Sequence, residues 1–147
     1  MALKKLFKKS GFTLVEIMIV IAVIIIVGAM AIPGLMRSRL NANEAAAVAA
    51  LKAISAASVT YRTTQTSYPA NITSLYDPNG AQYIDSILAS GAKQGYNFTV
   101  SGDEDGFNAS GTPAKINVTG SRYFFLDSNG VIRASTSGPA DGSSPAI

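Results

Sequence analysis

Apolar residues are concentrated near the start of the chain and run almost unbroken from Phe12 to Met36, with Glu16 as the only charged residue in that stretch. At about 1.5 Å per residue, a helix of this length crosses the roughly 30 Å of hydrocarbon in a bilayer. Residues 37–65 are rich in alanine, the best helix former, and the positions expected to face a core recur at spacings of three, four or seven. These positions are Leu40, Ala47, Leu51, Ile54, Ser58 and Tyr61. The pattern predicts one long N-terminal helix, in which residues 12–36 span a membrane and residues 37–65 form an amphipathic continuation.

Pro33 and Gly34 interrupt the helical pattern inside the apolar stretch. Proline has no amide hydrogen and its ring crowds the preceding turn, so we expect a helix break or kink at Pro33 and Gly34. Membrane helices tolerate such residues more readily than helices in water. Neither residue is therefore expected to end the helix.

From residue 66 onward the composition changes, and the later part of the chain alternates like β-strands. Three segments show this pattern: 95–102 (GYNFTVSG), 114–120 (AKINVTG) and 121–135 (SRYFFLDSNGVIRAS). Asn129 and Gly130 lie between two apolar runs of the last segment and predict a hairpin, because both residues accept a positive φ. We expect an antiparallel sheet of three or four strands.

The rest of this region, which we call the head (residues 66–134), is predicted to be irregular. Residues 66–80 read as a loop with one short helical turn, and residues 81–91 as a short helix. Residues 135–147 contain few apolar side chains and read as a flexible tail. The predicted fold class is α+β: a long N-terminal helix packed on a small antiparallel sheet.

Charge is unevenly distributed around the apolar stretch. Four lysines precede it, at positions 4, 5, 8 and 9, whereas only Arg37 and Arg39 follow it closely. By the positive-inside rule, the N-terminus is cytoplasmic and the head lies outside. Residues 1–11 read as a basic leader, and without them eight basic side chains face nine acidic ones. The high pI of the whole chain therefore does not indicate a nucleic-acid partner.

Several types of chemistry lack their usual residues. The chain has no cysteine and no histidine, which excludes disulfides, thiolate metal sites and the commonest general base. Asp103, Glu104 and Asp105 read as a solvated loop, because the full spacing of a calcium-binding loop is absent. No nucleophile elbow, phosphate loop or metal-ligand spacing is present. We expect a protein that is not an enzyme and that has no metal or cofactor.

The segment around the start of the apolar stretch carries a specific motif. Gly11, Phe12, Thr13, Leu14 and Glu16 stand in register directly before the apolar span. In this the sequence resembles the class III signal of type IV pilins and of type II secretion pseudopilins. Pro33 also falls where many of these proteins have a helix-breaking proline.

The resemblance implies a function and a set of partners. A prepilin peptidase would cut between Gly11 and Phe12, and Phe12 would be N-methylated. Glu16 would then meet the amino terminus of a neighbouring subunit in a homo-oligomeric filament. The prepilin would sit in the inner membrane with a pilus assembly platform and later become part of an extracellular pilus. The short leader and the Phe at position 12 resemble the type IVa subgroup.

Three alternatives remain open from the sequence. A type II secretion pseudopilin carries the same kind of signal. An ordinary secretory signal would be cut after Ala31, because Ala29, Met30 and Ala31 form an A-x-A-like site, although Glu16 is unusual inside such a signal. A one-span membrane protein with an outer binding module would keep residues 1–11.

Overall fold

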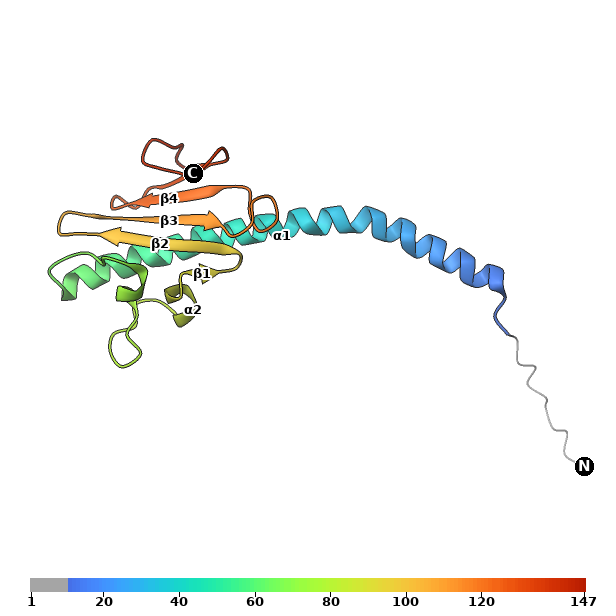
Figure 1. The fold of residues 1–147 in the computed structure, drawn as a ribbon, viewed down its shortest axis with the longest axis horizontal. Coiled ribbons are helices and arrows are strands. Elements are labelled where there is room, and N and C mark those ends of the chain that lie inside the picture. Colours follow the sequence, from blue (N-terminus) through green and yellow to red (C-terminus); the bar gives the residue numbers. More distant parts are fainter. Residues whose placement is uncertain (1–10) are drawn as a thin grey trace, which may run out of the picture. The chain divides into compact units, whose positions relative to one another are not determined.

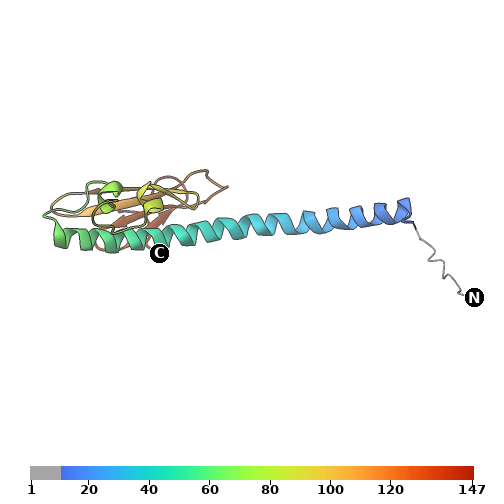
Figure 2. The same ribbon diagram turned by 90° about the horizontal axis from the view of Figure 1, so that it is seen from below.

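The structure is a computed structural model that describes residues 11–147, and the chain divides into two compact units, Met1–Leu35 and Met36–Ile147. Helix α1, Leu14–Thr64, belongs to both units. In the first unit the described residues of α1 are solvent-exposed, except Gly28, which is half-buried. In the second unit α1 lies along one face of a β-sheet (Figures 1 and 2).

The predicted long helix is present. It starts at Leu14 and ends at Thr64, one residue before the predicted limit of its amphipathic part. α1 continues through Pro33 and Gly34, so the helix does not end there; a bend at these residues stays a prediction. The predicted leader, residues 1–11, lies outside the described residues except for Gly11.

The head contains five antiparallel strands rather than the three or four that were predicted. They follow one another across the sheet in sequence order. The strands are β1 (Ala92–Lys93), β2 (Tyr96–Gly102), β3 (Phe107–Pro113), β4 (Tyr123–Asp127) and β5 (Ile132–Ser135). Each strand therefore pairs with its predecessor, and successive connections alternate between the two ends of the sheet.

One strand prediction was wrong in its location. Residues 114–120 were expected to form a strand, but they form a turn, and the strand lies just before them at Phe107–Pro113. The inward positions of this strand are Phe107, Ala109 and Gly111. Gly111 is closely packed, since an added Cβ would lie 3.2 Å from the Phe98 ring. This strand was not predicted because two of its inward residues are small, whereas strands are enriched in aromatic and β-branched side chains.

Two short helices precede the sheet, as predicted. The 3-10 helix η1, Ile72–Leu75, is capped by the Asn71 side chain, which accepts a hydrogen bond from the Ser74 amide. Helix α2, Ser86–Ala89, is capped in the same way by Asp85, which accepts from the Leu88 amide. These caps satisfy amide hydrogens that a helix start leaves unpaired.

The core lies between α1 and the inward face of the sheet. The buried residues of α1 include Ala47, Leu51, Ile54 and Ser58, which confirms the face predicted from the spacing. Opposite them the sheet contributes alternate residues; its largest fully buried side chains are Tyr96, Phe124 and Leu126. Helix and sheet thus bury one common apolar surface.

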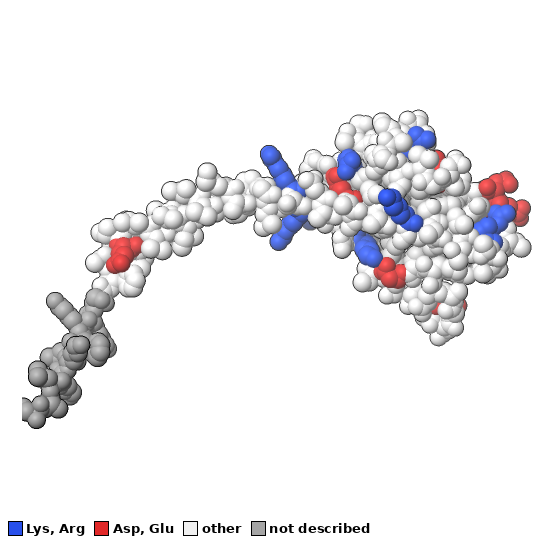
Figure 3. Space-filling view, turned by 180° about the vertical axis from the view of Figure 1, so that it is seen from behind, with Lys and Arg blue, Asp and Glu red and all other residues white. Residues whose placement is uncertain are grey.

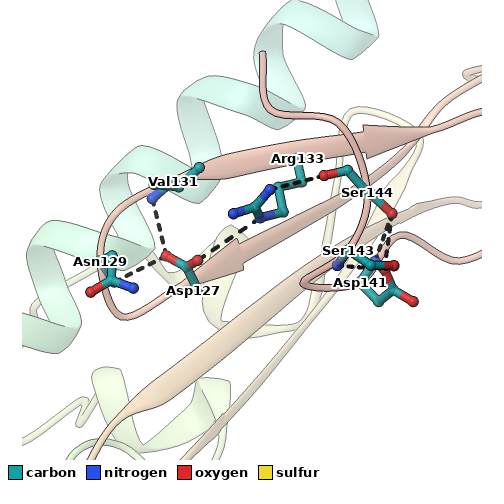
Figure 4. A network of polar contacts seen from close by, with 7 residues as sticks. All are labelled: Asp127, Asn129, Val131, Arg133, Asp141, Ser143 and Ser144. Atoms are coloured by element: carbon teal, nitrogen blue, oxygen red, sulfur yellow. Dashed lines mark hydrogen bonds and ion pairs between the residues drawn. The ribbon is translucent and has the colours of Figure 1, made fainter.

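The β4–β5 hairpin is confirmed, with a turn geometry that differs from the expected one. Gly130 has a φ of +78°, whereas Asn129 is not among the residues with positive φ. The Gly130 amide donates to the Asp127 carbonyl, and the Asp127 side chain accepts from the amides of Asn129 and Val131 (Figure 4). The turn therefore needs positive φ only at its glycine.

The end of the chain lies along the outer edge of β5. The Ala134 amide donates to the Pro145 carbonyl and the Ile147 amide donates to the Ile132 carbonyl. Arg133 Nη1 donates to the Ser144 carbonyl at 3.0 Å (Figure 4). None of these contacts was predicted from the sequence. They pair part of a strand edge that would otherwise expose backbone donors and acceptors.

Candidate functional site

The predicted processing and assembly residues stand at the start of α1. Gly11, Phe12 and Thr13 precede the helix. The Glu16 amide donates to Thr13 Oγ1 at 3.2 Å, and Glu16 Oε2 accepts a longer hydrogen bond, 3.5 Å, from the Thr13 amide. This reciprocal pair is a capping box, which satisfies two amides at a helix start. Thr13 and Glu16 of the signal motif therefore also fix where the helix begins.

The helix that follows this cap exposes apolar side chains on all sides. The large apolar residues between Leu14 and Met36 are each roughly half exposed or more. The most apolar window of α1 has a mean hydropathy of 3.0, so by length and composition this helix is able to cross a membrane. Figure 3 shows this part of the chain as uncharged apart from an acidic residue near its start, which is Glu16. Such a surface is stable only when lipid or other apolar groups cover it.

Glu16 is exposed in the single chain and has no cationic side chain among its described hydrogen-bond partners. A carboxylate on a helix in hydrocarbon costs about 2.5–3.5 kcal/mol at mid-membrane on insertion scales and less near the interface. Cleavage after Gly11 would create an α-amino group on Phe12, four residues before Glu16. The Glu16 carboxylate and this α-amino group would therefore lie at the same end of α1.

A second polar cluster, which the sequence analysis did not single out, ties the head to α1. Glu44 is 5% exposed, and its carboxylate accepts hydrogen bonds from the Ser121 amide at 2.9 Å and the Ser121 hydroxyl at 2.7 Å. Arg122 Nε donates to the other oxygen at 2.7 Å. The preceding residue of α1, Asn43, donates from Nδ2 to the Thr119 carbonyl at 2.9 Å. The connection between β3 and β4 is therefore held to the helix.

Titration in this cluster reflects its burial and its donors. Burial by itself raises the pKa of the Glu44 carboxyl, but the hydrogen bonds from Ser121 and the charged hydrogen bond from Arg122 hold that pKa below its ordinary value. Burial, and then the negative charge of Glu44, raise the pKa of the Tyr96 hydroxyl to about 12. That hydroxyl donates to the Arg122 carbonyl at 2.9 Å. Glu44 is thus charged and Tyr96 neutral near neutral pH.

The acidic loops of the head form turns. Asp103 Oδ1 accepts hydrogen bonds from the amides of Asp105 and Gly106, which together hold the pKa of Asp103 below its ordinary value. The Asp127 side chain binds the β4–β5 turn in a similar way. Within residues 11–147, no group of three or more acidic, histidine or cysteine side chains is placed to hold a metal ion.

Glu44 could have been found from a simple sequence signal. It lies three residues before Ala47 on the face that also carries Leu51 and Ile54, so it is an acidic residue on the predicted core face. Such a residue needs a partner on the packed element. The partners of Glu44 are Ser121 and Arg122, which lie 77 and 78 positions away in the sequence. Residue spacing alone does not reveal such a distant contact.

Comparison with known protein families identifies the N-terminal segment. Residues 6–32 match the family model described as the prokaryotic N-terminal methylation motif, the class III signal of type IV pilins. No curated protein and no solved structure matches the chain. The match covers Gly11, Phe12, Thr13 and Glu16, which are the residues that precede and cap α1.

The fold and the signal together define a class of protein. A long apolar N-terminal helix followed by a small five-stranded antiparallel sheet is a pilin-like α+β architecture. The methylation motif indicates a prepilin similar to those of type IV pilins and pseudopilins. This motif is a structural signal and not an enzymatic one.

Proposed function

We propose that this chain is the structural subunit of a type IV pilus. It is inserted in the inner membrane by α1, cut between Gly11 and Phe12 by a prepilin peptidase, N-methylated at Phe12 and polymerised into an extracellular filament. The observation that carries the proposal is the methylation motif over residues 6–32, placed directly on a helix whose large apolar side chains from Leu14 to Met36 are exposed in the described chain.

Burial supplies the driving force for polymerisation in this proposal. Apolar surface that would otherwise face water is stabilised by about 25 cal/mol per Å² when it is packed away from water. Leaving the bilayer would expose the apolar part of α1 on all sides. Parallel bundling of many copies covers this surface and leaves the sheet-bearing heads outside. The partners of the chain are then copies of itself and the assembly platform in the inner membrane.

Glu16 makes this assembly depend on processing. Its carboxylate needs a positive partner in an apolar bundle, and the α-amino group of Phe12 is that partner in a neighbouring copy. The amine exists only after cleavage. An uncut chain therefore brings an unpaired carboxylate into the bundle and is excluded from the filament.

The first test is the intact mass and N-terminal peptide of the protein sheared from cells. A mature chain that starts at N-methylated Phe12 is the expected result. A chain that starts at Ile32 would indicate an ordinary secretory signal, and a chain that keeps residues 1–11 would indicate a membrane-anchored binding module. Either of these would overturn the proposal.

A second test separates the charge of Glu16 from its helix-capping role. Glutamine at this position can still accept and cap the helix, because capping boxes use Glu or Gln, whereas alanine can do neither. We expect both Glu16→Gln and Glu16→Ala to be processed but to form few or no filaments in electron micrographs. Glu104→Gln, at an exposed acidic residue of the head, is the matched control and should assemble normally. Normal assembly of Glu16→Gln would mean that charge pairing is not required.

The methylation motif is shared by type II secretion pseudopilins, and this is the second candidate function. A pseudopilin builds a short periplasmic filament instead of a long surface fibre. Microscopy of cells that express the chain as the main subunit distinguishes the two. Long fibres that contain the chain support the pilus; a chain confined to the periplasm, whose loss stops protein secretion, supports the pseudopilin.

A further inference from the structure

The connection between β3 and β4 presents two exposed apolar side chains. Ile116 and Val118 are 48% and 58% exposed, in a turn that is exposed over residues 114–118 and packed only at Thr119 and Gly120. Single exposed apolar residues are common on protein surfaces. Two β-branched residues at alternate positions of one fixed turn, however, form a small apolar tip with little rotamer freedom to lose on binding.

Backbone and hydroxyl hydrogen bonds fix the shape of this tip. The amides of Val118 and Thr119 both donate to the Lys115 carbonyl, at 3.1 and 2.9 Å. The Lys115 amide donates to Thr119 Oγ1 at 3.0 Å. Asn117 adopts a φ of +59° between the two apolar residues, and its amide donates to the Gly120 carbonyl at 2.8 Å. The turn closes on itself and holds Ile116 and Val118 outward.

The base of the turn is tied to the rest of the head and to α1. Asn43 and Glu44 bind Thr119 and Ser121, as described above. Gly120 is buried against Tyr96, so closely that an added Cβ would lie 2.0 Å from the Tyr96 hydroxyl oxygen. The position of the tip relative to residues 36–44 of the helix is therefore fixed by direct contacts.

This position lies close to the end of the apolar stretch. Asn43 is seven residues beyond Met36, which is about 10 Å along a helix. The headgroup region on each side of a bilayer is about 5–8 Å thick. The turn follows the end of β3, at the end of the sheet where α1 enters residues 36–147 (Figure 1). If Met36 marks the outer limit of the hydrocarbon, side chains of this turn are within reach of the headgroups.

Basic side chains are exposed at this end of the head, whereas the acidic residue beside the turn, Glu44, is buried and paired with Arg122. Arg37 and Arg39 are exposed on α1, and Lys115 is exposed in the turn. Residues 36–43 and 112–120 contain no acidic residue. The acidic residues 103–105 belong to the β2–β3 connection, which lies at the opposite end of the sheet because the strands are antiparallel. The tip therefore combines apolar and basic groups, the pairing that favours binding to an anionic bilayer surface.

We propose that residues 114–120 form a lipid-contacting loop that rests on the outer surface of the membrane before assembly. Ile116 and Val118 enter the headgroup region, while the exposed Lys115, Arg37 and Arg39 bind lipid phosphates. The loop would fix how the head stands over the bilayer. This inference rests on the membrane stage of the proposed function. The loop would give the chain a second contact with the membrane, besides α1, and this contact could be released.

Tryptophan fluorescence tests the contact directly, because the chain has no tryptophan of its own. The full chain with Ile116→Trp is reconstituted in vesicles of phosphatidylcholine and phosphatidylglycerol that include lipids with a quencher near the headgroup. We expect the indole emission to shift to shorter wavelength and to be quenched. Asn129→Trp, in the exposed β4–β5 turn at the other end of the sheet, is the matched control and should show neither effect.

Electrostatic binding predicts a further dependence. Adding Lys115→Gln to the Ile116→Trp chain should weaken quenching in vesicles with phosphatidylglycerol and change it little in vesicles of phosphatidylcholine alone. Val118→Trp gives an independent probe if the Ile116→Trp chain does not fold, and it should behave in the same way.

The outcomes separate the loop from the membrane stage itself. A chain that floats with the vesicles but shows an unshifted, unquenched indole overturns the loop contact and leaves the proposed function standing. A shifted indole that lipid quenchers do not reach means that another copy covers the tip, which also overturns the lipid contact. A chain that does not float with vesicles contradicts the membrane stage of the proposed function and the loop contact together.

Discussion

The Glu44 carboxylate on α1 accepts a hydrogen bond of 2.7 Å from Arg122 Nε, across 78 positions of sequence. The two residues differ in burial, since 6% of the Glu44 side chain and 40% of the Arg122 side chain are exposed. The Arg122 guanidinium also lies 5.4 Å above the centre of the Phe124 ring. The buried Glu44 carboxylate therefore holds α1 to the connection between β3 and β4.

Replacing Glu44 should destabilise the head. Glu44→Ala removes the acceptor for the Ser121 amide, the Ser121 hydroxyl and Arg122, and hydrogen bonds to a charged group contribute about 1.5–3 kcal/mol each at most. We expect the free energy of unfolding to fall by about 2–3 kcal/mol. The measurement is denaturant unfolding of the full chain in detergent, followed by tyrosine near-ultraviolet circular dichroism. All six tyrosines lie between residues 61 and 123, so this signal reports the head and the end of α1 that packs on it.

Glu104→Ala serves as the control for that comparison, because Glu104 is exposed and its contact to Arg62 uses the backbone carbonyl. It should leave the unfolding free energy nearly unchanged. Equal stabilities for the Glu44 and Glu104 variants would mean that the cluster contributes nothing to folding.

Glu44 should also make the stability of the head depend on pH. Its folded pKa lies below its ordinary value, so the unfolded chain takes up the proton first as the pH falls. The stabilisation is complete above the unfolded pKa of about 4.3 and is lost as the pH falls through the lower folded pKa. We expect Glu44→Gln to be less stable than the parent chain at neutral pH, and the difference to shrink towards about pH 3. A difference that stays constant over this range would show that Glu44 is not charged in the folded state.

The part of the fold that sequence predicted is the part encoded by local periodicity. The apolar run and the spacing of Ala47, Leu51 and Ile54 gave α1 and its buried face, and the apolar runs around Asn129 and Gly130 gave the last hairpin. These signals depend on neighbours in sequence and on one common core. The motif at Gly11–Glu16 was equally local, and it carried the class of protein.

The parts that sequence missed depend on distant contacts. β3 was overlooked because two of its inward residues, Ala109 and Gly111, are small; the side chains of Phe98 and Leu51 occupy the space beside Gly111. Residues 114–120 were read as a strand because Ile116 and Val118 alternate with polar residues, whereas both are exposed in a turn. The Glu44 cluster and the C-terminal pairing with β5 join segments that no sequence spacing relates.

Ser58 offers a substitution that should stabilise the protein. Its side chain is completely buried in α1, and its hydroxyl has no hydrogen-bond partner. A buried, unsatisfied hydroxyl costs about 1–3 kcal/mol, and alanine is the better helix former. We expect Ser58→Ala to raise the unfolding free energy by about 1 kcal/mol, measured by the same near-ultraviolet signal. Thr60→Ala, at an exposed position of the same helix, controls for helix propensity, and an equal gain from both changes would remove the argument from burial.

Gly120 is the position where the head should tolerate a side chain least. An added Cβ would lie 2.0 Å from the Tyr96 hydroxyl oxygen and 2.4 Å from the ring carbon that bears it. Tyr96 cannot easily move away, because it is 1% exposed, packs against Phe124 at a centroid distance of 5.7 Å and donates to the Arg122 carbonyl. Overpacking a core typically costs about 1–3 kcal/mol, and a contact this short places Gly120→Ala at or above the upper end of that range.

Gly138→Ala is the matched control for Gly120→Ala, since an added Cβ at Gly138 meets no atom within 4 Å and the residue does not have a positive φ. That change should leave the unfolding free energy within about 1 kcal/mol of the parent value. Gly120→Ala should also release the turn at its base, so amide hydrogen exchange at Asn117 and Thr119 should become faster than in the parent chain. A Gly120→Ala chain with parental stability and unchanged exchange would show that Tyr96 can yield, and that the turn is not held by this contact.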